Sequence, residues 1–163
     1  MGEKGERLEK KVVLPVGELK TLLCPANPNT RGTNLPPFTH YVGVAGVGAD
    51  AATLVKGEPR AGIFGYDRRT KREDIKDTSN TLHLIETATA NGPWTAGGHA
   101  TVRGLDPEGP PYLGRGGQFS SGHGLTQATL ADGSVRPISP AVSRRVLEAL
   151  ATVTARDNVD LDW

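Results

Sequence analysis

Residues 127–136 constrain the fold most strongly, because a strand-like run meets a tight turn signal there. Residues 127–131 alternate as a strand does, the chain then has Asp132-Gly133, and residues 134–136 lead back. Asp-Gly between two such runs favours a two-residue type I′ turn, in which both central residues need positive φ. The sequence therefore predicts a β-hairpin. Pro137 removes a ladder donor and predicts that the returning strand lies at a sheet edge or ends there.

A helix is predicted to follow the hairpin over residues 140–153. Ser139 has the chemistry of an N-cap, and Pro140 suits the first helical position. Apolar residues then recur at helical spacing, namely Val142, Val146, Leu150 and Val153. This pattern indicates an amphipathic helix that packs on the sheet.

Glycine and proline dominate the rest of the chain. The 163 residues contain 21 Gly and 12 Pro and are only 36% apolar, so much of the chain is expected to be loop. Strands are predicted over residues 39–47, 61–66 and 81–88, with long irregular loops over 27–37 and 97–124. One globular α+β domain is expected over residues 21–155, preceded by a charged tail or helix remnant (1–20) and followed by an acidic tail (156–163).

Charge and hydropathy name no partner. The 19 basic and 18 acidic residues give a net charge of +1, which provides no field to gather nucleic acid. The chain has no run of about 18 apolar residues, so no membrane span is predicted. Cys24 is the only cysteine and is interpreted as a small packing residue, because no base or helix start lies beside it in the sequence.

The spacing of the candidate reactive residues gives only weak evidence for a metal or catalytic site. The four histidines, His40, His83, His99 and His123, lack the spacing of a metal pair, so neither a metal nor another cofactor is expected. Ser120 or Ser121 with His123 suggests a serine hydrolase, but no Gly-x-Ser-x-Gly elbow is present. A calcium-binding module on the acidic tail is a further alternative. Its oxygen ligands would be Asp157, Asp160 and Asp162.

Several motifs, taken in order, resemble a bacterial prepilin-type family of uncharacterised function. That family is marked by a C-terminal histidine, a nine-residue spacer and Asp-Gly; here eight residues, 124–131, separate His123 from Asp132. The positions that carry the resemblance are Cys24, Pro25, Ser79, Asn80, Glu86, Trp94, His123, Asp132 and Gly133. They lie in or near the matching segments 24–28, 41–46, 62–64, 77–81, 119–123 and 131–136.

The resemblance implies a structural protein rather than an enzyme. Family members look like type IV pilins and type II secretion pseudopilins, which implies a loop-rich antiparallel sheet domain facing the periplasm or cell envelope. Partners would be proteins or further copies of the chain, and the membrane would be reached only through an N-terminal hydrophobic helix that this chain lacks. If Glu86 is buried at the end of its strand, it needs a partner, for which His123 and Arg136 are the candidates.

Overall fold

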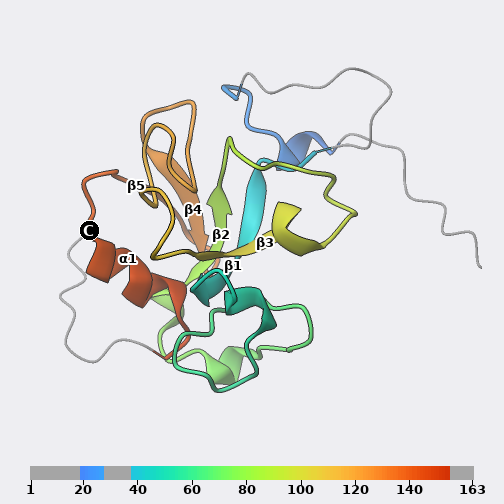
Figure 1. Cartoon of the computed structure of the whole chain (residues 1–163), viewed down its shortest axis with the longest axis vertical. Helices are drawn as coiled ribbons and strands as arrows, with labels where there is room; N and C mark the ends of the chain where they lie inside the picture. Colours follow the sequence, from blue (N-terminus) through green and yellow to red (C-terminus); the bar gives the residue numbers. More distant parts are fainter. Residues whose placement is uncertain (1–18, 28–37, 155–163) are drawn as a thin grey trace, which may run out of the picture.

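A computed structural model describes residues 19–27 and 38–154, and it contains one five-stranded sheet with a helix packed on it (Figure 1). The strands are β1 (Tyr41–Val47), β2 (Leu82–Glu86), β3 (Val102–Leu105), β4 (Thr126–Leu130) and β5 (Val135–Ile138), and the helix is α1 (Arg144–Ala151). The spatial order is β3-β1-β2-β4-β5. An α+β fold is therefore correct. The expected antiparallel sheet is wrong in one respect, because β3 runs parallel to β1.

The predicted hairpin is confirmed, although its turn is wider than expected. β4 and β5 pair antiparallel, and β5 with Pro137 is the edge strand, as the missing N–H requires. Gly133 has a φ of +90°, whereas Asp132 does not have a positive φ. The type I′ prediction was thus wrong. Instead, the Asp132 carboxylate accepts hydrogen bonds from the Ser134 N–H and hydroxyl and orders a four-residue connection.

The C-terminal helix exists but begins later than predicted. Ser143, not Ser139, is the N-cap, and its side chain accepts a hydrogen bond from the Val146 N–H. Ser139 instead orders the turn before the helix by accepting from the Ala141 N–H. Of the predicted stripe, Leu150 is fully buried and Val146 partly buried on α1, whereas Val142 and Val153 lie outside the helix. Leu147, which was not predicted, completes the face that packs against β1, β2 and β3.

Strand β3 lies inside the segment that we predicted to be an irregular loop. Its four residues contain Gly104, and a Cβ there would approach the Gly48 carbonyl oxygen to 2.3 Å. The glycine that weakened the strand pattern is therefore what permits close packing. Conversely, residues 61–66 form no strand, although the Gly62 N–H donates to the Ala45 carbonyl of β1.

The sheet and α1 enclose the main apolar core. Val42, Leu82, Ile85 and Leu130 are fully buried there together with Leu150. Among residues 19–27 and 38–154, no helix is both long and apolar enough to cross a membrane. The two predicted tails and most of the 27–37 loop lie largely outside the described residues.

Candidate functional site

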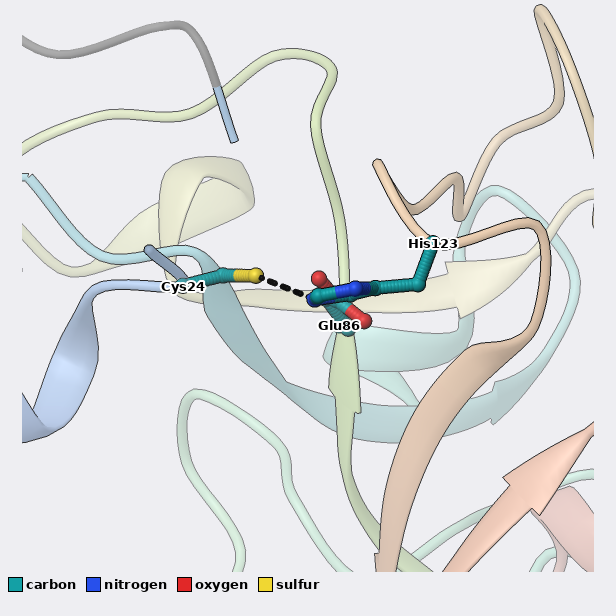
Figure 2. Close-up of side chains that lie close together, drawn as sticks. All are labelled: Cys24, Glu86 and His123. Carbon is teal, nitrogen blue, oxygen red and sulfur yellow. Dashed lines mark hydrogen bonds between the residues drawn. The ribbon is translucent and has the colours of Figure 1, made fainter. Parts of the chain in front are cut away.

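Three side chains from distant parts of the sequence converge at one end of the sheet. Cys24 precedes β1, Glu86 ends β2, and His123 lies on the loop before β4. One potential ligand atom from each lies within 4.8 Å of the other two. Cys24 Sγ and His123 Nε2 are 3.1 Å apart, and the three side chains point toward one another in Figure 2. We call these three residues the Cys-Glu-His cluster.

Backbone contacts to the start of β1 position Cys24. The Cys24 N–H donates to His40 Nδ1 at 2.9 Å, and the His40 N–H donates to the Leu22 carbonyl. Pro25 then turns the chain, closed by the Asn27 N–H donating to the Cys24 carbonyl at 3.1 Å. Cys24 is buried, as a packing residue would be, but it faces polar neighbours.

A close loop-to-loop contact positions His123. A Cβ added to Gly122 would lie 2.5 Å from the Ala26 carbonyl oxygen, so only glycine lets this loop approach the Cys24 turn so closely. Ser121 Oγ accepts a hydrogen bond from the His123 N–H at 2.9 Å and orders the loop. The His123 residue as a whole remains exposed to solvent.

The carboxylate of Glu86 is fully buried and incompletely bonded. Its Oε2 accepts from the Gln127 N–H at 3.2 Å, while Oε1 has no partner with hydrogen-bond geometry among the described residues. Glu86 is buried, as hypothesised. His123 lies within 4.8 Å of it, but the hydrogen bond that Glu86 makes among residues 19–27 and 38–154 comes from the Gln127 N–H and from neither predicted partner. Arg136, the other candidate, lies on the exposed edge strand β5 and interacts electrostatically with Asp132.

Burial and charge shift the acidity of the groups around Glu86. Burial, and next hydrogen bonding with Glu86, raise the pKa of the Cys24 thiol. Burial also raises the pKa of Tyr41, with smaller contributions from the charges of Cys24 and Glu86. Tyr41 is paired with Glu86 between β1 and β2. A protonated thiol has one hydrogen and therefore cannot donate to both Glu86 and His123.

The residues of the serine hydrolase alternative are not arranged for nucleophilic attack. The Ser121 hydroxyl oxygen accepts a hydrogen bond from the His123 backbone N–H, and Ser120 is buried. The His123 ring contacts Cys24 Sγ. A serine nucleophile needs the base within hydrogen-bond reach of its hydroxyl, and no such serine–imidazole bond is found among residues 19–27 and 38–154. The calcium candidates Asp157, Asp160 and Asp162 lie outside the described residues.

Other positions of the predicted family motif form a second junction. Asp77 caps the short 3₁₀ helix η4 (Thr78–Asn80) by accepting from the Ser79 N–H, and Asn80 Nδ2 donates to the same carboxylate. The turn into β2 is therefore ordered mainly by Asp77. The Asp132 N–H donates to the Thr78 carbonyl, which joins η4 to the hairpin next to Gly133. Trp94 is partly buried on the connection between β2 and β3.

No family model, curated protein or solved structure matches this chain. The resemblance to the prepilin-type family therefore stays a prediction.

Local spacing could not reveal the Cys-Glu-His cluster, because its members are separated by tens of residues. No base stands beside Cys24 in the sequence, because the imidazole that contacts it comes from 99 residues away. His40 accepts a hydrogen bond from the Cys24 N–H, and the Gln127 N–H donates to Glu86. No local sequence pattern predicts either contact. The usable signal was the polar Glu86 at the end of an apolar strand.

Proposed function

We propose that this chain is a non-catalytic structural or interaction domain, similar to the soluble part of a pseudopilin, and a subunit or module of an extracytoplasmic assembly. The observation that carries the proposal is that the motif residues make contacts between segments of the fold that are far apart in the sequence. Cys24, Glu86 and His123 bring three segments together, and Ser79 and Asp132 lie at the junction of two more. Residues that mark the resemblance thus serve as connections within the fold.

The chemistry of Cys24 also favours a non-catalytic role. A cysteine nucleophile requires a thiolate that substrate can reach. The Cys24 residue is only 3% exposed, and burial raises the pKa of its thiol. Both features oppose attack on a substrate, even though an imidazole lies 3.1 Å from the sulfur.

An active-site probe tests the non-catalytic part of the proposal. A fluorophosphonate labels activated serines covalently, so we expect no labelling of the purified chain. Stoichiometric labelling of Ser120 or Ser121 that is lost in His123→Ala would contradict the proposal and support the serine hydrolase alternative.

A reporter fusion tests the location. Alkaline phosphatase folds to its active form only where disulfides form. Fused to the C-terminus of the full gene product in its native host, the enzyme should be active. Activity equal to that of a cytoplasmic fusion, at matched protein levels, would contradict an extracytoplasmic assembly.

A further inference from the structure

The buried carboxylate of the Cys-Glu-His cluster has an oxygen without a hydrogen-bond donor among the described residues. Glu86 is fully buried, yet its Oε1 lacks a hydrogen-bond donor with acceptable geometry among residues 19–27 and 38–154. The Cys24 thiol is a candidate donor in the cluster, but it has a single hydrogen, and its sulfur also contacts His123 Nε2 at 3.1 Å. A buried carboxylate with an unused oxygen is costly unless a cation or donor completes it.

The fold holds the three donor groups in place from separate sides. His40 accepts from the Cys24 backbone, Gln127 donates to Glu86 Oε2, and Ser121 orders the backbone of His123. None of these contacts uses Cys24 Sγ, Glu86 Oε1 or His123 Nε2. These contacts therefore leave the three ligand groups facing one another, and an ion bound between them would replace the 3.1 Å contact of Cys24 Sγ with His123 Nε2. Supporting contacts of this kind orient metal ligands.

We propose that Cys24, Glu86 and His123 bind a divalent transition-metal ion, with Zn²⁺ the best match. One thiolate sulfur, one imidazole nitrogen and one carboxylate oxygen make a mixed ligand set that suits zinc, whereas calcium and magnesium prefer oxygen ligands alone. The bound ion would cross-link the Cys24 turn, the end of β2 and the loop before β4. Three protein ligands leave one tetrahedral position for water.

The distances fit this ion after small side-chain movements. In a tetrahedral zinc site, bond lengths of about 2.3 Å to sulfur and 2.1 Å to nitrogen separate those two atoms by about 3.6 Å. Cys24 Sγ and His123 Nε2 are 3.1 Å apart, and the Glu86 oxygen lies within 4.8 Å of both. Because His123 is on an exposed loop, its ring can adjust without disturbing the core.

A protonated His123 is the competing explanation. An imidazolium would supply a positive charge beside Glu86 without any ion, and the cluster would then be a purely structural ion pair. The two explanations differ in one respect that can be measured. Only the metal site predicts a thiolate bound to the ion.

Cobalt substitution detects that thiolate directly. The full chain, reduced and freed of metal with a chelator, is titrated with Co²⁺ and followed by absorption spectroscopy. We expect a 1:1 endpoint, a near-ultraviolet sulfur-to-cobalt charge-transfer band and intense visible bands of a four-coordinate site. Cys24→Ser should abolish the charge-transfer band while preserving the size of the side chain. An unchanged band in Cys24→Ser, or no band in the wild-type chain, would overturn the proposal.

Zinc affinity then tests the other two ligands. In competition with a chromophoric chelator, Glu86→Gln and His123→Ala should weaken Zn²⁺ binding by at least about 100-fold, the upper end of what loss of a supporting contact costs. The control His99→Ala removes an exposed histidine on the 3₁₀ helix η5 (Gly98–Ala100), outside the cluster, and should leave the affinity unchanged. Equal effects of His99→Ala and His123→Ala would contradict the assignment.

Thermal unfolding completes the test with the same metal-free protein. Zn²⁺ should raise Tm in the wild type and His99→Ala but not in His123→Ala, because binding only the folded state stabilises it. Calcium should not raise Tm; a rise with Ca²⁺ and none with Zn²⁺ would reject the zinc site in favour of oxygen ligands. This inference is independent of the assembly role, which the phosphatase fusion tests separately.

Discussion

Ile85 and Glu86 are neighbours on β2, and both are fully buried, yet they belong to opposite kinds of environment. Ile85 packs in the apolar core beneath α1, between partners on β1 and β4. Glu86 ends in the polar cluster, where one of its oxygens lacks a donor among the described residues. The core is complete without any addition, whereas the cluster is not. This difference assigns packing stability to one region and the proposed metal binding to the other.

The largest expected effect separates the two regions by stability. Ile85→Ala should lower the free energy of unfolding by about 2–5 kcal/mol, because it removes buried methyl groups and leaves a cavity. Urea denaturation with and without Zn²⁺ measures this, and the loss should be similar in both conditions. Val135→Ala, at a residue that is 63% exposed on β5, is the control and should change stability little. A loss of stability in Ile85→Ala no larger than in Val135→Ala would break the comparison.

Glu86→Gln should produce a smaller change whose sign depends on the metal. In chelator-treated protein, the amide keeps an acceptor for the Gln127 N–H but removes the buried charge, so we expect stability to rise by about 1 kcal/mol. With Zn²⁺ in excess, the variant should instead be less stable than the wild type. Glu58→Gln, at an exposed residue, is the control. A loss in the metal-free state as large as that of Ile85→Ala would mean that the carboxylate is itself a required structural group.

Ser143→Ala sharpens the core side of the comparison. Removing the N-cap of α1 leaves the Val146 N–H without its side-chain acceptor and should cost about 1 kcal/mol, measured by thermal or urea unfolding. Ser139→Ala, at the cap that the sequence predicted, should cost less because Ser139 bonds within the preceding turn. The reverse order would place the start of the helix at Pro140.

Asp132→Asn should have the smallest effect, visible only in acid. Hydrogen bonds from Ser134, first its hydroxyl and then its backbone, hold the pKa of Asp132 below its ordinary value of 3.8. The carboxylate therefore contributes stability above that value and loses its contribution as the pH falls through the folded-state pKa. Unfolding followed between about pH 5 and pH 2 should show a shallower pH dependence in the variant. Identical slopes would show that this exposed junction does not depend on the charge.

The sequence predictions were right where a feature depends on neighbouring residues and wrong where it depends on long-range packing. The hairpin at Gly133, strand β2 and the apolar stripe of α1 were predictable, because each depends on residues close together in the chain. Strand β3 was missed because Gly104 disguised it, and its pairing depends on how closely Gly48 approaches. The cap moved from Ser139 to Ser143 because packing on the sheet selects where the helix begins.

The sequence alone determined where polar and apolar groups alternate, where the chain can turn, and that Cys24, Glu86 and His123 each stand out from their surroundings. Only the tertiary structure decided that these three residues meet, since sheet pairing brings together the end of β2 and the start of β4 and packs the Cys24 turn beside them. Local sterics and hydrogen bonding act within a few residues, so local sequence patterns predict their effects. A binding site built from three segments depends on long-range packing, which local patterns do not encode.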